Sequence, residues 1–186
     1  MKRLYSLIII VSASLWPVYP ALHAAITVPV AKNLQQDGSQ AVSQRLPILL
    51  TVTSLACSYC ELLEQDFLQP MLLGGHYRDK VIIRKLELYP GATVIDFNGQ
   101  SITVSELSDR YRVFVTPTLL FVDGNGKELA ERMIGINTPE LYGGYLDNCI
   151  ETALLYIRDA QKAARIRGCQ LQPAANRDTV FTTAAP

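Results

Sequence analysis

Residues 47–68 read PILLTVTSLACSYCELLEQDFL, and this stretch decides the fold. It opens with a nearly continuous apolar and β-branched run, which is typical of a strand covered on both faces. Beyond Cys57 the apolar residues recur at helical spacing, and Pro70 and the Gly74-Gly75 pair end the pattern. The stretch therefore predicts a buried strand followed by a helix that opens with two cysteines, Cys57 and Cys60.

The segment after this helix predicts a second strand and a hairpin. Residues 81–88 read VIIRKLEL, a buried strand that should lie parallel to the first across the helical crossover. Asn98-Gly99 predicts a two-residue hairpin turn, because both residues tolerate positive φ. Thr103 and Glu106 have the spacing of a capping box and should start a short helix.

The remaining elements complete a layered α/β pattern. The turn signal DGNGK at 123–127 predicts antiparallel strands over 118–122 and 128–133. Thr138-Pro139-Glu140 begins the last helix, with proline at its first position. We therefore expect an α/β fold with a mixed central sheet flanked by helices in a single domain.

Composition limits the possible partners. Of the 186 residues, 49% are apolar and 18% charged, and Lys+Arg and Asp+Glu each number 17. Neither intrinsic disorder nor a strongly basic surface is indicated, so nucleic acid is not an expected partner. The polar segment 170–186 has no core pattern, and we expect a disordered tail there.

The N-terminus has the pattern of an export signal. Met1-Lys2-Arg3 is followed directly by the apolar run 4–11 and then by small residues and prolines. Cleavage after Ala24 would deliver the protein to the periplasm, and an uncleaved N-terminal anchor is the alternative. The expected division is a signal peptide over 1–24, an N-terminal extension over 25–44, a domain over 45–169 and the tail over 170–186.

The paired cysteines are the candidate chemistry. In an oxidising compartment a thiol pair is either a structural bridge or a redox centre. Helix N-terminal N–H groups favour a thiolate, so Cys57 is the predicted nucleophile. Cys60 lies three residues on, on the same side of the helix, and is the predicted resolving thiol. A purely structural bridge or half of a metal site stays open, although only His23 and His76 could add imidazole ligands, and no metal or organic cofactor is implied.

A second cysteine pair is less defined by sequence. Cys149 lies in the last helical pattern, and Cys169 follows Gly168, a residue that could end a helix. An unbroken helix to Arg167 would separate the two cysteines by about 30 Å, far beyond bridging distance. A possible structural disulfide between them requires a turn, for example near Asp159. Otherwise Cys149 is a buried apolar residue and Cys169 an exposed thiol.

The order strand, C-x-x-C, helix, strand, followed by Val115-Thr116-Pro117-Thr118 at the start of the next strand, resembles the thioredoxin superfamily. The resemblance covers roughly residues 45–158, and within the superfamily the chain resembles the SoxW-like periplasmic thioredoxins. The resemblance implies a cis Thr116–Pro117 bond that faces the dithiol, with an extended substrate segment paired beside it. It also implies that the residues contacting substrate are Ser58, Tyr59, Thr116 and Pro117.

Several positions depart from the family pattern. Ala56 stands where thioredoxins have tryptophan, and Ser58-Tyr59 replaces Gly-Pro between the cysteines, so the substrate range should differ. The buried acid that family members often carry six residues before the first cysteine is Thr51 here. Proton transfer to Cys60 would then need water or another group, for which Glu87 is a candidate.

Charge favours a reducing role. Glu61, Glu64 and Asp66 follow the cysteines without a basic residue in the helix, and they oppose the helix dipole at Cys57. We therefore expect a monomeric reductase of protein disulfides, re-reduced by a membrane thiol-disulfide electron carrier as the resemblance implies. A donor to one dedicated partner is a narrower version. The alternative is an exported binding or assembly module whose Cys57–Cys60 disulfide is only structural.

Overall fold

The computed structural model describes residues 26–159 and residue 169. The expected signal peptide over 1–24 and the expected tail over 170–186 lie outside the described residues. The elements, in chain order, are α1 Leu34–Gln44, β1 Ile48–Ser54, α2 Ser58–Leu63, the π-helical turn η1 Glu64–Leu68, α3 Gln69–Gly74, β2 Ile82–Leu88, β3 Thr93–Ile95, β4 Ser101–Thr103, α4 Val104–Arg110, β5 Thr118–Val122, β6 Met133–Ile134 and α5 Pro139–Arg158.

The central sheet is mixed, as the sequence predicts. Its strand order is β2-β1-β5-β6, while β3 and β4 form a separate two-stranded sheet. β1 pairs parallel with β2, in the register Ile48 to Ile82, and antiparallel with β5. β6 pairs antiparallel with β5 at the edge of the sheet. The crossover from β1 to β2 runs through α2, η1 and α3 and confirms the predicted βαβ unit.

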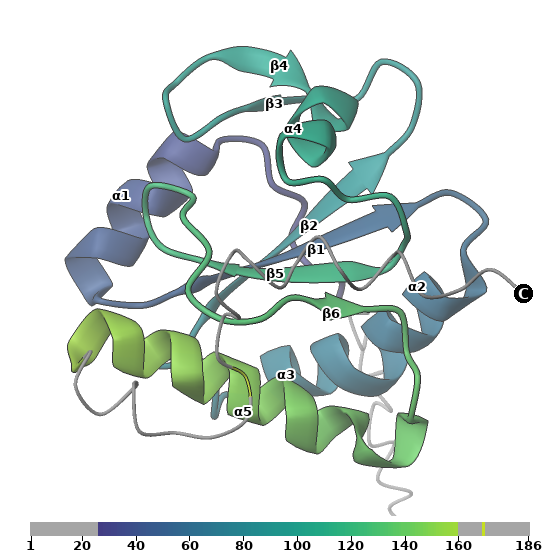
Figure 1. The fold of residues 1–186 in the computed structure, drawn as a ribbon, viewed down its shortest axis with the longest axis vertical. Helices are drawn as coiled ribbons and strands as arrows, with labels where there is room; N and C mark the ends of the chain where they lie inside the picture. The colour runs from purple at the N-terminus through teal and green to yellow at the C-terminus, as the bar shows by residue number, and fades with distance from the viewer. Residues whose placement is uncertain (1–25, 160–168, 170–186) are drawn as a thin grey trace, which may run out of the picture.

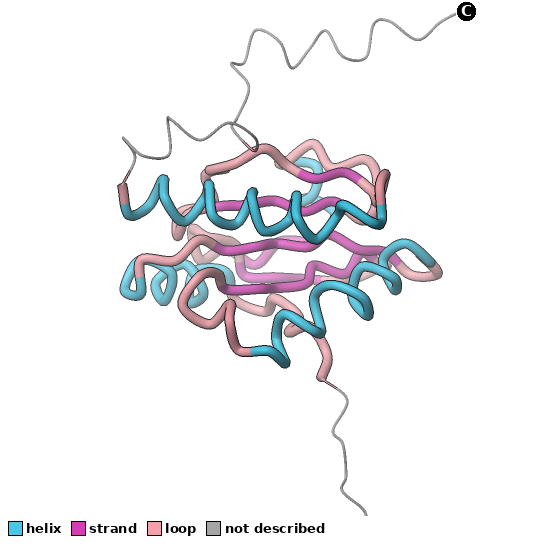
Figure 2. The backbone as a smooth tube through the Cα atoms, turned by 90° about the horizontal axis from the view of Figure 1, so that it is seen from below, coloured by secondary structure: helices cyan, strands magenta, loops and turns pink. Residues whose placement is uncertain are grey.

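Helices cover both faces of this sheet (Figure 1). Along β1, Leu50 packs in the cluster that includes residues of α1 and α4. Its neighbour Leu49 packs on the opposite face against α2, α3 and α5. Figure 2 shows the fold from below, with the long α5 running alongside the strands. The continuous apolar run of β1 therefore reflects burial on both faces, which confirms the expected layered α/β fold.

The segment over 34–44, expected as part of an N-terminal extension, packs into the core. Asn33 caps α1 by accepting a hydrogen bond from the Gln36 N–H, and Leu34 and Ala41 are fully buried. The chain before α1 also joins the sheet through a parallel bridge between Val30 and Lys85. The folded unit thus includes residues before 45. Most residues of this segment are polar, so the sequence alone did not indicate that one side of α1 is buried.

The hairpin around Asn98-Gly99 is wider than the two-residue turn that the sequence predicts. β3 ends at Ile95 and β4 begins at Ser101, directly opposite it. The five residues between them are organised by the Asp96 carboxylate, which accepts hydrogen bonds from the backbone N–H groups of Asn98 and Gln100 at 2.9 Å. These side-chain bonds add to a backbone turn in which the Gly99 N–H donates to the Asp96 carbonyl at 3.0 Å.

The last predicted strand is shorter than expected. Of residues 128–133, only Met133 belongs to β6, and Glu128 makes an isolated bridge to Val122. Between them, the Arg132 guanidinium pairs with the Glu128 carboxylate and donates to the Tyr111 carbonyl at 2.6 Å. The chain bends at Ala130, and the Glu131 N–H donates to the Cys169 carbonyl instead of to β5, which interrupts the ladder before Met133.

The last helix, α5, begins at Pro139 as predicted and ends at Arg158. Its buried residues include Tyr142, Leu146 and Cys149, which pack under the sheet. Within residues 26–159 and 169, no helix is both long and apolar enough to span a lipid bilayer.

Candidate active site

The first cysteine of the pair caps a helix. β1 ends at Ser54, and two loop residues lead to Cys57, with Ala56 held at φ 54° in the left-handed region. Cys57 has extended backbone angles, and its Sγ accepts a hydrogen bond from the Cys60 N–H at 3.2 Å. The Cys60 N–H also donates to the Cys57 carbonyl at 3.0 Å, so it is shared between the two acceptors, and its bond to the sulfur favours a thiolate there.

Cys57 and Cys60 are joined by a disulfide, with Cα atoms 5.2 Å apart. The two sulfurs differ in access: Cys60 is only 6% exposed, whereas Cys57 is half-buried at the mouth of the loop. An incoming thiol or disulfide can therefore reach Cys57 more readily than Cys60. This asymmetry fits a nucleophile at Cys57 and a resolving thiol at Cys60.

The segment around Pro117 faces the disulfide. The Thr116–Pro117 peptide bond is cis, and Pro117 is buried. Two hydrogen bonds hold the segment: the Gly135 N–H donates to the Pro117 carbonyl at 2.8 Å, and the Thr118 hydroxyl donates to the Val115 carbonyl at 2.6 Å. Loop and sheet edge together fix the backbone beside the disulfide.

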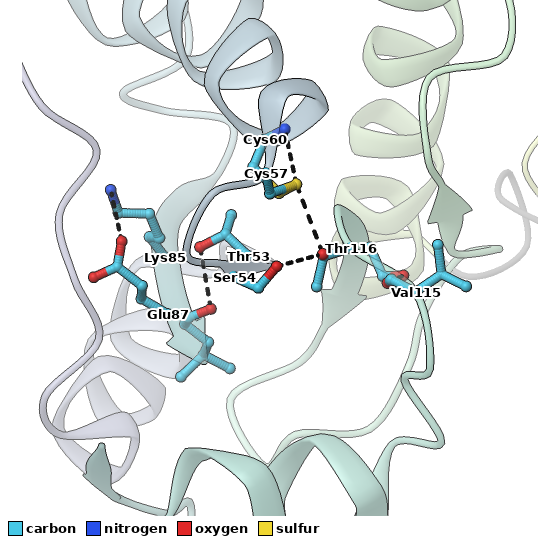
Figure 3. The surroundings of a disulfide bond; sticks show 10 residues. Thr53, Ser54, Cys57, Cys60, Lys85, Glu87, Val115 and Thr116 are labelled. Carbon is cyan, nitrogen blue, oxygen red and sulfur yellow. Dashed lines mark hydrogen bonds and ion pairs between the residues drawn. A yellow bond between two sulfur atoms is a disulfide. The ribbon is translucent and has the colours of Figure 1, made fainter. Parts of the chain in front are cut away.

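The side chain of Thr116 reaches the disulfide directly (Figure 3). Its hydroxyl lies 3.7 Å from Cys57 Sγ, to which it donates, and 2.8 Å from the Ser54 hydroxyl. Cys57 Sγ thus has two donors, one from the helix backbone and one from the proline segment.

Large apolar side chains are exposed on both segments that meet at Cys57. Tyr59, inside the C-x-x-C pair, is 58% exposed, and Phe114, just before the proline segment, is 82% exposed. Leu55 and Val115 are also exposed, as is Ser58. We call Leu55, Tyr59, Phe114 and Val115 the apolar rim. Of the residues implied as substrate contacts, Ser58, Tyr59 and Thr116 are at least partly exposed, while Pro117 is buried.

A basic residue neutralises part of the acidic charge on the active-site helix. Lys85, on β2, pairs with Glu64 at 2.9 Å, and the other Glu64 oxygen accepts from the Val28 N–H at 3.3 Å. Burial raises the pKa of Glu64, but the hydrogen bonds from Lys85 and Val28 outweigh it and hold this pKa below its ordinary value. Of the three acidic residues, Glu61 and Asp66 are left exposed. The opposition to the helix dipole is thus weaker than the sequence suggests.

No carboxylate occupies the position of the family's buried acid. Thr51 is buried there, and its hydroxyl has no hydrogen-bond partner within the described residues. Glu87, the sequence candidate for proton transfer, lies at the end of β2 with its side chain 35% exposed and 4.0 Å from Lys85. Its partner in the structure is Lys85.

The second pair, Cys149 and Cys169, is also joined by a disulfide, with Cα atoms 4.9 Å apart. The geometric requirement is met because α5 stops at Arg158 instead of continuing to Arg167. Both cysteines are buried against the sheet. In addition, the Glu131 N–H donates to the Cys169 carbonyl at 3.1 Å. The bridge and this hydrogen bond fasten residue 169 beside the chain that leads into β6.

Sequence reasoning missed two residues of the site. Ser54 follows the predicted strand run, which ends at Thr53, and Lys85 is a polar position within the next predicted strand. Register could have found Lys85, because it pairs with Thr51 across the parallel strands. Nothing local signals Ser54, since its partner Thr116 lies 62 residues away.

Metal binding finds no support in the described part of the chain. No group of three or more His, Cys, Asp or Glu side chains is placed there to hold an ion.

Comparison with known proteins identifies the family. The sequence profile described as thioredoxin-like domain matches residues 34–150. The chain belongs to this thioredoxin-like family. The match includes α1, in agreement with its place in the core. Family membership together with the C-x-x-C pair supports thiol-disulfide oxidoreductase activity in general.

Solved structures with a similar fold are thioredoxins and a Dsb protein. Oxidised thioredoxin O2 from Arabidopsis thaliana shares 21% identity at a TM-score of 0.41, covering 67% of this chain and 96% of that one. The DsbH oxidoreductase shares 20% identity at a TM-score of 0.48, covering 76% and 95%. Oxidised mitochondrial thioredoxin 3 from Saccharomyces cerevisiae shares 18% at 0.42, covering 64% and 94%. No curated protein matches the chain.

Proposed function

We propose that this protein is a periplasmic reductase of protein disulfides, similar to the SoxW-like thioredoxins. The observation that carries the proposal is the accessible sulfur of Cys57, held at a helix N-terminus between the Cys60 N–H and the Thr116 hydroxyl. Its resolving partner, Cys60, is buried directly behind it.

The reaction is two successive thiol-disulfide exchanges. The Cys57 thiolate attacks one sulfur of a substrate disulfide, forms a mixed disulfide and releases the other substrate sulfur as a thiolate, which takes up a proton. Cys60 then loses its proton and attacks Cys57 Sγ. The substrate's second thiolate leaves, and the Cys57–Cys60 disulfide forms. Two electrons pass from the dithiol to the substrate.

The apolar rim supports a protein as substrate. Exposed apolar side chains around a reactive group are typical of a surface that contacts another macromolecule. Tyr59 lies between the two cysteines in the sequence and Phe114 three residues before Pro117, and both side chains are largely exposed. An extended chain with apolar residues on both sides of its disulfide would bury them, while its backbone pairs beside Pro117.

The direction of electron flow is proposed from charge. Glu61 and Asp66 remain exposed on the active-site helix and destabilise a Cys57 thiolate, although Lys85 neutralises Glu64. A less stabilised thiolate makes the dithiol a better electron donor. Re-reduction then needs a dithiol of lower potential, for which we propose a thiol-disulfide carrier in the inner membrane.

The periplasmic location is proposed from the sequence of residues 1–24, outside the described part of the chain. Cell fractionation with mass measurement of the N-terminus tests it. A periplasmic protein that begins at Ala25 supports the proposal. A membrane-bound protein with its full N-terminus supports the uncleaved anchor instead.

A redox titration tests the activity. The purified protein is equilibrated in dithiothreitol or glutathione buffers, and Cys57 and Cys60 are quantified by alkylation and mass mapping. A reversible transition near the thioredoxin potential of about −270 mV supports a reductase, whereas one near about −120 mV indicates an oxidase. Reduction of insulin disulfides, lost in Cys57→Ser, completes the test.

The same titration separates the rival function. If Cys57 stays unreactive to alkylating reagents after mild reduction, the disulfide is structural and the protein is a binding or assembly module.

A further inference from the structure

Three hydroxyl and sulfur atoms line up at the end of β1 (Figure 3). The Ser54 hydroxyl lies 2.8 Å from the Thr116 hydroxyl, which lies 3.7 Å from Cys57 Sγ. Ser54 is the last residue of β1, and the backbone beside Thr116 is held by the hydrogen bond from the Gly135 N–H to the Pro117 carbonyl at 2.8 Å. Both hydroxyls therefore stand on backbone that the sheet holds in place.

The direction of these hydrogen bonds follows from proton count. The Thr116 hydroxyl has one proton, which it can give either to Ser54 or to Cys57 Sγ. When Cys57 is a thiolate, its charge favours the second choice, because hydrogen bonds to ionised acceptors are the stronger ones. The Ser54 hydroxyl must then donate to Thr116, and donation into one end of such a chain strengthens the other.

We propose that Ser54 is a positioning residue for the nucleophile: by donating to Thr116 Oγ1 it commits the Thr116 proton to Cys57 Sγ and so stabilises the Cys57 thiolate. The proposal deepens the proposed function, because it assumes that Cys57 reacts as a thiolate. Ser54 does not touch the reacting sulfur. It acts through Thr116 alone.

The variant Ser54→Ala tests this in the reduced full-length protein. Cys57 alkylation is followed against pH, with mass mapping to separate Cys57 from Cys60. We expect the apparent pKa of Cys57 to rise and the equilibrium with glutathione to shift about two- to tenfold towards the Cys57–Cys60 disulfide, the range of one ordinary hydrogen bond. An unchanged pKa and an unchanged equilibrium would overturn the proposal.

A double-mutant cycle isolates the path through Thr116. Thr116→Val removes the donor to Cys57 and keeps the shape of the side chain, so it should shift Cys57 in the same direction as Ser54→Ala. Adding Ser54→Ala to Thr116→Val should then change nothing further. A full Ser54 effect in the Thr116→Val background would show that Ser54 acts by another route and would also overturn the proposal.

Thr53→Val is the matched control. Thr53 is the neighbouring residue on β1, and its buried hydroxyl donates to the Leu86 carbonyl at 3.5 Å. Its loss should leave the Cys57 pKa unchanged. A shift in Thr53→Val equal to that in Ser54→Ala would reveal a general effect of altering this strand and would contradict a specific role of Ser54.

The alkylation measurement needs no substrate, so the two proposals fail separately. If the protein does not reduce insulin but Ser54→Ala shifts the Cys57 pKa, the hydrogen-bond proposal stands and the reductase proposal fails. If wild type and Ser54→Ala reduce insulin at the same rate and have the same potential, the reductase proposal stands and the hydrogen-bond proposal fails.

Discussion

Cys149 and Cys169 lie 20 residues apart in the sequence, yet their Cα atoms are 4.9 Å apart and their sulfurs are bonded. Both side chains are at most 5% exposed, in contrast to half-buried Cys57. The chain thus carries one disulfide that reagents can reach and one that they cannot reach without opening the fold.

The buried bridge should contribute stability without contributing to the chemistry. Replacing both Cys149 and Cys169 with alanine should lower the free energy of unfolding by about 3 kcal/mol, the loop-closure value for a ring of this size. Urea denaturation measures the loss, and Cys57 alkylation should stay as in the wild type. An unchanged free energy of unfolding would contradict this prediction, because it would mean that the disulfide does not restrict the unfolded chain.

The two active-site cysteines should behave differently when substituted. Cys60→Ser leaves the accessible nucleophile and removes the resolving thiol, so mixed disulfides with substrate proteins should accumulate on Cys57. Non-reducing electrophoresis followed by mass mapping detects them. Cys57→Ser is the matched control and should trap far less, because Cys60 is only 6% exposed. Equal trapping by both variants would contradict the assigned roles.

The buried carboxylate of Asp96 should make stability depend on acid pH. Hydrogen bonds from the Gln100 N–H, Arg110 and the Asn98 N–H outweigh burial and hold the pKa of Asp96 below its ordinary value. A pKa lowered by folding adds stability above the unfolded pKa of about 3.9, and this stability is lost as the pH falls through the folded pKa.

Asp96→Asn tests this linkage. The wild type should exceed the variant in urea stability at neutral pH, and the difference should shrink at about pH 3. Asp109→Asn, at an exposed position of α4, serves as the control and should show little difference at either pH. A difference for Asp96→Asn that is constant with pH would argue against a charge effect.

The ion pair beneath the active-site helix should matter more than one on the surface. Lys85 and Glu64 have side chains only 16% and 19% exposed, and Lys85→Met leaves the Glu64 charge without its partner. We expect a loss of about 1 to 3 kcal/mol in the free energy of unfolding, below the cost of breaking a fully buried pair.

Lys80→Met is the matched surface control. Lys80 Nζ lies 3.8 Å from Glu151 Oε2, and the two side chains are 46% and 51% exposed. Loss of this pair should lower the free energy of unfolding by less than about 1 kcal/mol. Chemical denaturation of both variants gives the comparison. Similar losses of unfolding free energy in Lys85→Met and Lys80→Met would show that the lower exposure of the Lys85–Glu64 pair does not strengthen its contribution to stability.

Local sequence determined the elements that carry the pair of cysteines. The apolar run over 47–53 is buried on both faces because it forms the centre of the sheet, and periodicity alone located the helix that begins after Cys57. The Thr103 hydroxyl likewise caps α4 by accepting from the Glu106 N–H, and such a cap involves only residues three apart. These signals are short-range, so one sequence contains them completely.

Tertiary structure decided the rest of the site. Ser54 meets Thr116, Lys85 neutralises Glu64, and Cys169 bonds to Cys149, each across a separation that no local pattern encodes. The chemistry of Cys57 and Cys60 follows from their spacing and their place at the start of a helix, both of which are local. Which hydroxyls and charges surround these sulfurs depends on strand register and on the placement of the Thr116–Pro117 segment, and only the folded chain sets those distances.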